Sequence, residues 1–241
     1  MCGLAGGVGR TVPGTGRVST RAELHQRWVI VEGARRMNAL RINHGTSGNV
    51  SARYGEGMLI TPSALSYDHM DGEDIVEFAS LDSRPRGGRR RPSTEWRLHA
   101  GIYTARPMVG AIVHAHPMHA TSLACLRRGI PAFHYLVAAA GGREIRCSRY
   151  ATFGSPDLAA AAVEALGDLN ACLLANHGIV TCGRTVAQAL ALAVEVEALA
   201  TLYWHALQVG EPVLLTDEEM TRVLRLFEHY RPDASGGGTG P

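Results

Sequence analysis

Three histidines and one glutamate have the residue types and spacing expected of a catalytic metal site. His114 and His116 end an apolar run that begins at Gly110, and the two-residue period of a strand directs both imidazoles to one face, where they can bind a single metal ion. A third imidazole, His177, follows a second apolar run and precedes a glycine that allows a sharp turn. The carboxylate of Glu95 adds a charged ligand. Three histidines leave one zinc position open for substrate, which favours a catalytic site over a structural one.

The chain contains no lysine, because all 24 of its basic side chains are arginines. Schiff-base formation with a carbonyl substrate, attachment of pyridoxal phosphate and a phosphate-loop lysine all require a lysine amine, so the sequence excludes these mechanisms. If this protein stabilises a carbanion, a metal must do so.

Length and composition indicate one globular domain. The 241 residues are 46% hydrophobic and 19% charged, with a formal net charge of +2, which neither requires a second domain nor suggests a nucleic-acid partner. The basic segment 84–91 contains no aromatic residue and is interrupted by glycine and proline. We therefore expect a solvated loop there rather than a phosphate-steering surface.

The cysteines and the apolar segments favour a cytoplasmic protein. The five cysteines form no Cys-x-x-Cys pair and are odd in number, which fits a reducing compartment. The N-terminus lacks a basic start followed by a sustained apolar stretch, and no window of about 20 apolar residues occurs elsewhere. We expect neither export nor a membrane span.

Periodicity and capping patterns predict a single domain over residues 20–232, with disordered ends at 1–19 and 233–241. A capping box at Thr20 begins the first helix, which we expect to end near 43–45. Glu95 falls in the first turn of a helix expected from about Ser93 to Arg106. The other expected elements are a hairpin of strands 49–53 and 57–61, a strand at 74–78, the strand ending at His116, helices at 117–126 and from Pro156, strands at 171–175 and 179–182, a long helix at 185–208 and a last helix from Thr216. This order indicates a three-layer α/β/α fold with a mixed sheet.

Three segments of small and hydroxyl-bearing residues are candidate anion sites. Segment 45–49 joins the first helix to a strand and can present successive backbone amides as a nest. Segments 60–64 and 92–95 repeat this chemistry, and the second lies at a helix N-terminus, where the dipole favours a phosphate. Each segment also fits a structural turn, so both interpretations stay open.

The other histidines are interpreted as ordinary core or surface residues. His119 is near the ligand pair, but it follows Pro117, where a helix is expected to begin, so it no longer shares the face of the strand. The full set is His25, His44, His69, His99, His119, His134, His205 and His229.

Eight short motifs occur in an order that resembles the class II aldolase/adducin family, most closely its L-fuculose-1-phosphate aldolase branch. The similarity covers about residues 20–232. The motifs are Thr46–Arg53, Met58–Ser63, Ser93–Arg97, His114–His116, Ile130–Tyr135, Ala138–Gly142, Tyr150–Gly154 and Asn176–Gly178. Eight motifs in order are far more specific than any one of them.

The resemblance implies a class II metal-dependent aldolase on an α/β fold with a largely antiparallel sheet. His114, His116 and His177 would bind one Zn²⁺ per chain, or another divalent ion, and Glu95 would be the acid/base that occupies the fourth metal position when substrate is absent. The substrate would be a ketose 1-phosphate, with L-fuculose 1-phosphate cleaved reversibly to dihydroxyacetone phosphate and L-lactaldehyde through a metal-stabilised enediolate. Glu95 would protonate C3, and Tyr135 would exchange a proton with the aldehyde oxygen.

The resemblance also implies a phosphate site and an aldehyde pocket. The phosphate would be held by Gly48, Asn49, Ser63, Ala64, Ser93 and Thr94. Tyr135 and Tyr230, with Phe153 and Phe227, would line the aldehyde side, and the tyrosines would reach in from or across a neighbouring subunit of a fourfold-symmetric homotetramer. Two positions depart from the family pattern: Ala64 stands where glycine is usual, and Thr94 replaces a second serine.

Three alternatives remain at this point. A sugar-phosphate 4-epimerase of the L-ribulose-5-phosphate type would resemble the chain at the metal ligands, but such enzymes usually have Asp where Glu95 stands and an acidic residue within 133–135. A methylthioribulose-1-phosphate dehydratase would share the metal and the glutamate. A non-catalytic adducin-like interaction module would share the fold but lack the metal ligands.

Overall fold

The computed structural model describes residues 20–86 and 88–229, so the expected N-terminal extension, the C-terminal tail and Tyr230 lie outside the described residues. In chain order the elements are α1 (Arg21–Ala39), β1 (Asn49–Tyr54), β2 (Gly57–Ile60), η1 (Tyr67–His69), η2 (Gly72–Asp74), β3 (Val76–Phe78), α2 (Trp96–Ala105), β4 (Ala111–Ala115), α3 (Met118–Cys125), η3 (Tyr135–Ala140), α4 (Pro156–Leu166), β5 (Ala171–Leu174), β6 (Gly178–Gly183), α5 (Val186–Val209) and α6 (Asp217–His229).

One six-stranded sheet forms the middle layer, in the order β3-β2-β1-β4-β6-β5. All neighbouring named strands run antiparallel. Within the described residues, a parallel contact occurs as an isolated bridge between Cys147 and Leu173. The expected α/β class is confirmed, and the sheet is more uniformly antiparallel than interspersed helices and strands alone suggest.

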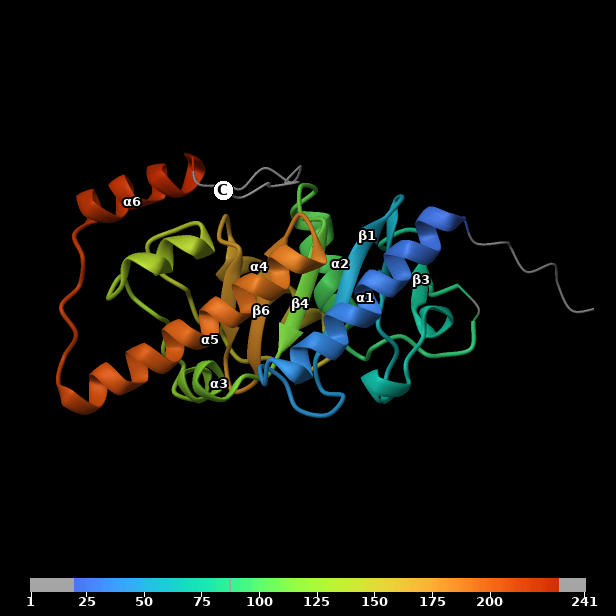
Figure 1. The fold of residues 1–241 in the computed structure, drawn as a ribbon, viewed down its shortest axis with the longest axis horizontal. Coiled ribbons are helices and arrows are strands. Elements are labelled where there is room, and N and C mark those ends of the chain that lie inside the picture. The colour runs from blue at the N-terminus through green and yellow to red at the C-terminus, as the bar shows by residue number, and fades with distance from the viewer. Residues whose placement is uncertain (1–19, 87, 230–241) are drawn as a thin grey trace, which may run out of the picture.

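Helices cover both faces of the sheet and give each face its own core. On one face α1, α3, α5 and η3 pack against alternate strand residues such as Val50, Val113 and Leu173. On the other face α2 and α4 pack against the intervening residues, including Ile112 and Val180. Figure 1 shows α1 and α5 crossing in front of the strands, with α2 and α4 behind them. This alternation follows from the two-residue period of a strand.

α5 is the single helix in the described part of the chain that is long and apolar enough to cross a membrane by length and composition. It packs along β4 and β6, and Ala189, Ala193 and Val196 are fully buried there. Packing against the sheet therefore accounts for the apolar side chains on one side of α5, and about 44% of its apolar window is buried.

The ends of α1 show where capping patterns predict well and where they do not. The hydroxyl of Thr20 accepts a hydrogen bond from the Glu23 amide at 3.1 Å, as expected. The helix ends at Ala39, about four residues before the predicted stop. Arg41 takes a left-handed conformation with φ of 57°, and the Ile42 amide donates to the Met37 carbonyl at 3.1 Å. This is a Schellman ending, and an arginine in place of glycine hides it from the sequence.

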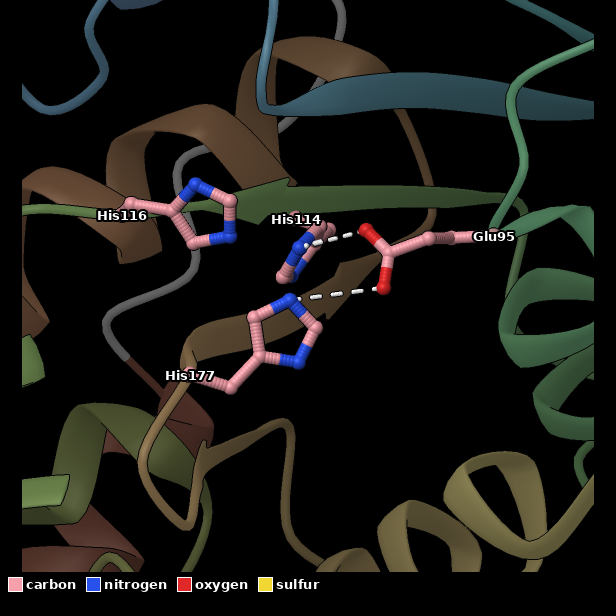
Figure 2. A group of neighbouring side chains, drawn as sticks. All are labelled: Glu95, His114, His116 and His177. Atoms are coloured by element: carbon pink, nitrogen blue, oxygen red, sulfur yellow. Dashed lines mark ion pairs between the residues drawn. The ribbon is translucent and has the colours of Figure 1, made fainter. Parts of the chain in front are cut away.

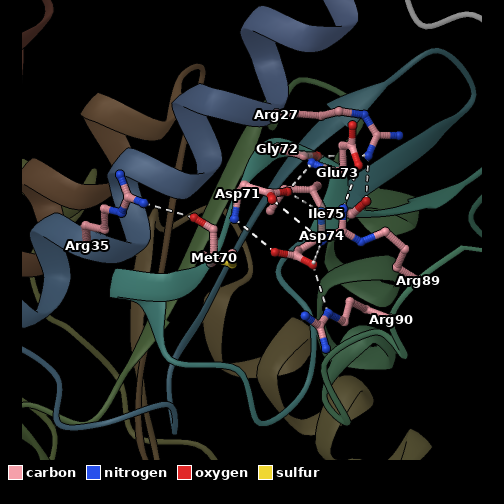
Figure 3. A network of polar contacts seen from close by, with 10 residues as sticks. All are labelled: Arg27, Arg35, Met70, Asp71, Gly72, Glu73, Asp74, Ile75, Arg89 and Arg90. Atoms are coloured by element: carbon pink, nitrogen blue, oxygen red, sulfur yellow. Dashed lines mark hydrogen bonds and ion pairs between the residues drawn. The ribbon is translucent and has the colours of Figure 1, made fainter.

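The basic segment 84–91 is partly organised by acidic residues rather than solvated alone. Asp74 is 1% exposed, and its carboxylate accepts hydrogen bonds from Arg90 at 2.8 Å and Arg89 at 3.2 Å. Arg27 reaches the same region and donates to the Ile75 carbonyl at 2.6 Å. Figure 3 shows these arginines converging on η2 from α1 and from the basic segment. The segment is thereby attached to the fold next to β3.

Candidate metal and active site

Glu95, His114, His116 and His177 form one compact cluster. Their potential ligand atoms all lie within 4.8 Å of one another. Glu95 Oε2 is 2.8 Å from His114 Nε2, and Glu95 Oε1 is 3.4 Å from His177 Nε2. Figure 2 shows the carboxylate facing these two rings, with His116 on the far side of the group. The structure thus brings together all four residues that the sequence singled out for a metal.

The strand β4 positions the first two histidines as its period predicts. His114 lies opposite Asn49 of β1, and His116 follows the last strand residue, so the two ring centroids are 4.7 Å apart. His114 Nδ1 lies 2.8 Å from the carbonyl oxygen of Ile179 in β6. That contact assigns the hydrogen to Nδ1, which leaves Nε2 to point into the cluster as a ligand.

A tight turn between β5 and β6 positions His177. Asn176 has φ of 54°, a left-handed conformation that asparagine tolerates better than most residues. A Cβ on Gly178 would lie 2.5 Å from the Ala115 carbonyl oxygen and 2.5 Å from His116 Cδ2. Glycine is therefore required here because the turn passes close to both strand and ligand.

Glu95 is the N-cap residue of α2, just before the expected first turn, and its side chain does not cap the helix. It is 4% exposed, and Asn49 Nδ2 donates to its Oε2 at 3.3 Å. Burial acts to raise the pKa of Glu95, but the nearby charge of His114, then the charge of His177 and the hydrogen bond from Asn49, hold that pKa well below its usual range. The carboxylate is thus turned away from the helix and toward the histidines.

The histidines have opposite pKa shifts. Burial lowers the pKa of His116 to about 3 and that of His177 to about 4, with the charge of His114 adding to both shifts. Burial also opposes the charged form of His114, but the Glu95 carboxylate outweighs it and raises the pKa of His114. His116 and His177 are therefore neutral near pH 7, the state in which an imidazole binds a metal.

Three atoms of the cluster are buried without a hydrogen bond: Glu95 Oε1, His114 Nε2 and His116 Nε2. Leaving a buried polar atom unpaired costs about 1–3 kcal/mol, so such a concentration is unusual outside functional sites. One divalent cation at the centre would bind all three atoms. Three imidazoles and one carboxylate match the ligand set of zinc and of related divalent ions, so the residues fit a metal.

The three small-residue segments meet beside this cluster through Thr61. The amide of Val50, next to Asn49, donates to Thr61 Oγ1 at 3.2 Å, and the amide of Ser93 donates to the Thr61 carbonyl at 3.0 Å. Pro62 and Pro92 form an isolated bridge. Segments far apart in the sequence are therefore held side by side, at the edge of the Glu95 cluster.

The candidate phosphate residues differ in exposure. Asn49 and Ser93 are buried, Ser63 is half-buried, and Ala64 and Thr94 are exposed. Ala64 has φ of 56°, the left-handed conformation that explains why glycine would suit the position. The Gly48 carbonyl accepts a hydrogen bond from the Tyr67 hydroxyl.

Three of the four candidate aldehyde-side residues lie in the described part of the chain, and they come from separate segments. Tyr135, in η3, is 50% exposed and lies against His134, with ring centroids 4.8 Å apart. Phe153 is 67% exposed and precedes Gly154, whose Cβ would lie 3.0 Å from the Thr94 carbonyl oxygen. Phe227, on α6, is half-buried against the larger core, and Tyr230 lies outside the described residues.

One residue next to the cluster was not predicted to matter. His99 is fully buried, as expected of a core histidine, but its Nε2 contacts Asn49 Oδ1. The sequence signal was weak: His99 lies four residues after Glu95, one helical turn away on the same face of α2. Its partner comes from β1, which only the tertiary packing reveals.

Comparison with known proteins agrees with this arrangement. Residues 29–204 match the family described as Class II Aldolase and Adducin N-terminal domain. The chain belongs to this family, as the ordered motifs indicated.

Individual relatives narrow the class to aldolases. The chain is 49% identical to the 5-methylthioribulose-1-phosphate/5-deoxyribulose-1-phosphate aldolase of Rhodospirillum rubrum, over 85% of this chain and 92% of that protein. It is 43% identical to the L-fuculose phosphate aldolase of Escherichia coli K12, over 83% and 93%. A solved structure of an L-fuculose 1-phosphate aldolase matches with a TM-score of 0.82 and 36% identity, over 85% of this chain and 96% of that chain.

The protein is therefore an enzyme of the lyase class, an aldolase of the class II type. This finding removes the alternative of a non-catalytic module. The cluster of three histidines and Glu95 is where such an enzyme can hold its divalent metal.

Proposed function

We propose that this protein cleaves a ketose 1-phosphate between C3 and C4, reversibly, to dihydroxyacetone phosphate and an aldehyde. The observation that carries the proposal is the cluster of Glu95, His114, His116 and His177, with three buried ligand atoms that lack hydrogen bonds. Residues 20–232 would form one cytoplasmic catalytic domain around it.

The phosphate would bind where the three small-residue segments meet. The backbone and side chains around Gly48, Asn49, Ser63, Ala64, Ser93 and Thr94 are proposed to hold it. These segments are held together through Thr61, and Ser93 and Thr94 precede the N-terminus of α2, which favours an anion. Neutral donors of this kind fit a chain without lysine.

Glu95 would carry the proton at C3. We propose Zn²⁺ as the bound metal, which would supply Lewis-acid stabilisation of the negative charge that develops when the C3–C4 bond breaks. The electron pair of that bond passes to C3, and Glu95, which is ionised before substrate binds, would take up a proton from solvent and donate it there, giving dihydroxyacetone phosphate. In the reverse direction the Glu95 carboxylate removes the same proton.

As the aldehyde carbonyl forms, Tyr135 of a neighbouring subunit would accept the proton of the C4 hydroxyl on its oxygen and pass its own phenolic proton to solvent, which balances the proton that Glu95 takes up. The 50% exposure of Tyr135 in the single chain supports a role at an interface. We accordingly propose a homotetramer with fourfold symmetry, in which Tyr135, Tyr230, Phe153 and Phe227 line the aldehyde side of sites shared between subunits.

Three substrates are candidates, and they share the dihydroxyacetone phosphate half. L-Fuculose 1-phosphate, which would give L-lactaldehyde, is supported by the motif resemblance and by the relative from E. coli. 5-Deoxyribulose 1-phosphate and its 5-methylthio analogue are supported by the relative at 49% identity. Each ends in a chain without a terminal hydroxyl, so we propose a deoxygenated ketose 1-phosphate as the substrate class.

A panel of substrates tests this proposal. Dihydroxyacetone phosphate release is measured from L-fuculose 1-phosphate, 5-deoxyribulose 1-phosphate and 5-methylthioribulose 1-phosphate, and the highest kcat/KM assigns the substrate. Release from none of them, together with epimerisation of L-ribulose 5-phosphate or dehydration of methylthioribulose 1-phosphate, would contradict the proposal and identify one of the two enzymatic alternatives.

Hybrid tetramers test the shared site. The variants Glu95→Gln and Tyr135→Phe are each expected to lose turnover. If a site combines Glu95 of one subunit with Tyr135 of its neighbour, co-assembly of the two variants in equal amounts restores about a quarter of the sites. No recovery in verified hybrids would place both residues in one subunit's site and contradict the proposed interface.

A further inference from the structure

A buried chain of hydrogen bonds leads from α2 through β1 to Glu95. Tyr103 Oη lies 2.8 Å from Ser51 Oγ, and Ser51 Oγ lies 2.6 Å from His99 Nδ1. His99 Nε2 contacts Asn49 Oδ1, and Asn49 Nδ2 is 3.3 Å from Glu95 Oε2. Two elements that pack against each other, β1 and α2, supply every member.

The chemistry of the donors fixes one direction for the whole chain. An ionised Glu95 carboxylate only accepts, so Asn49 presents its amide nitrogen to Glu95 and its Oδ1 to His99. Because Oδ1 carries no hydrogen, His99 must donate from Nε2. A neutral imidazole then accepts at Nδ1, so Ser51 donates to His99, and Tyr103 in turn donates to Ser51. All four hydrogen bonds point toward the carboxylate.

Burial makes this arrangement the single one available. His99 and Ser51 are 0% exposed, Tyr103 is 1% exposed and Asn49 is 2% exposed, so water cannot replace a missing partner. Burial, with the charge of His114, lowers the pKa of His99 to about 3, which agrees with a neutral ring. Without the donor on His99 the amide of Asn49 could rotate and present its oxygen to Glu95.

We propose that His99 is a positioning residue, whose Nε2–H donor fixes the amide of Asn49 so that Asn49 holds the Glu95 carboxylate in place for proton transfer at C3. This inference rests on the proposed acid/base role of Glu95. It assigns to His99 and Ser51 an effect on turnover, although neither touches the substrate.

Two substitutions at His99 distinguish the effect of losing the Nε2–H donor from the effect of changing the volume of the side chain. His99→Leu fills a similar space without a donor, whereas His99→Gln can place an amide N–H near the position of Nε2. A buried hydrogen-bonding group that loses its partner typically changes the rate or equilibrium constant that depends on it by a factor of about 10–100. We expect kcat to fall by about that factor in His99→Leu, with KM changed less than about threefold, and to recover at least partly in His99→Gln.

Ser51→Ala breaks the chain one bond further from Glu95 and changes less volume. It serves as the second variant if His99→Leu does not fold, and its kcat is expected to fall by about 3- to 10-fold. Tyr103→Phe removes the last donor of the chain and is expected to change kcat by less than about threefold. A loss that decreases with distance from Glu95 is expected of a positioning chain.

Hydrogen exchange at C3 of dihydroxyacetone phosphate measures the proton transfer by Glu95 separately from carbon–carbon cleavage. Exchange of this hydrogen with deuterium in D₂O requires Glu95 but no aldehyde, and we expect the exchange rate to fall in His99→Leu by the same factor as kcat. Equal exchange in His99→Leu and wild type would overturn the role of His99. No exchange by wild type would instead contradict the proposed function.

Nitrogen NMR of the wild-type protein, labelled at histidine, tests the arrangement without turnover. We expect His99 to be protonated at Nε2 and unprotonated at Nδ1, and the Nδ1 signal to shift in Ser51→Ala. A His99 ring protonated at Nδ1 would reverse the direction of the chain and overturn the inference, whatever the enzyme cleaves.

Discussion

Gly178→Ala is expected to damage the metal site without replacing a ligand. The new Cβ would lie 2.5 Å from the Ala115 carbonyl oxygen and 2.5 Å from His116 Cδ2, whereas carbon atoms in contact normally stand about 3.5–4.0 Å apart. The turn and the His116 ring must therefore separate by about 1 Å. Ligand distances in metal sites tolerate about 0.2 Å, so His116 would lose its place.

These two close contacts determine the expected losses of stability and of metal affinity in Gly178→Ala. Overpacking of this kind lowers the free energy of unfolding by about 1–3 kcal/mol, and a disturbed ligand is expected to weaken metal binding by about 10- to 100-fold or more. Calorimetric titration of the metal-free protein with Zn²⁺ measures the affinity, and denaturant unfolding of the same preparation measures the stability. Gly178→Ala should therefore show both a lower zinc affinity and a lower free energy of unfolding.

Gly210→Ala is the matched control. A Cβ there meets no heavy atom within 4 Å, so the same substitution should leave zinc affinity and stability close to wild type. If Gly178→Ala bound zinc as tightly as Gly210→Ala, the close approach between the turn and His116 would not matter to the metal site, and the reasoning would be refuted.

Three further substitutions test the surroundings of the site. Thr61→Val leaves the buried Val50 amide without its acceptor, and chemical denaturation should show a loss of about 1–3 kcal/mol; an unchanged midpoint would contradict the role of Thr61. Ala64→Gly removes the left-handed strain at φ of 56° but gains unfolded-state entropy, so the free energy of unfolding should rise by up to about 1 kcal/mol; a clear decrease would count against strain at this position. Although burial acts to raise it, hydrogen bonds and charges from Arg90, the Asp71 amide and Arg89 lower the pKa of Asp74. A lowered carboxyl pKa stabilises the folded state above the unfolded value of about 3.9, and this stabilisation is lost as the pH falls below that value. The free energy of unfolding of wild type should therefore exceed that of Asp74→Asn by about 1–2 kcal/mol from pH 7 to 5. A difference that persists unchanged to pH 2 would contradict the ion pairs.

Local patterns predicted the elements and the clustering of the four candidate ligands well, because they depend on short-range geometry. The strand period placed His114 and His116 on one face, and the cap at Thr20 formed as expected. The left-handed end of α1 at Arg41 was missed, since no glycine marks it. The helix η3 was also missed, although it carries Tyr135.

Long-range contacts account for what the sequence could not predict. The four-residue spacing from Glu95 is the one weak sign that sets His99 apart from other core histidines, because its partner Asn49 is 50 positions away. Thr61 likewise joins two candidate phosphate segments through contacts that only strand pairing creates. In the proposed tetramer the surroundings of Tyr135 and Phe153 would include neighbouring subunits, so the aldehyde pocket stays a prediction.

Glu95 and the three histidines are proposed to hold the metal that carbon–carbon cleavage requires. The most direct test is dihydroxyacetone phosphate release by the purified protein before chelation, after chelation and after addition of stoichiometric Zn²⁺, with Glu95→Gln in parallel. We expect chelation to abolish release, Zn²⁺ to restore it, and Glu95→Gln to bind zinc without turnover. Undiminished release by the metal-free protein, or near wild-type turnover by Glu95→Gln, would contradict the claim.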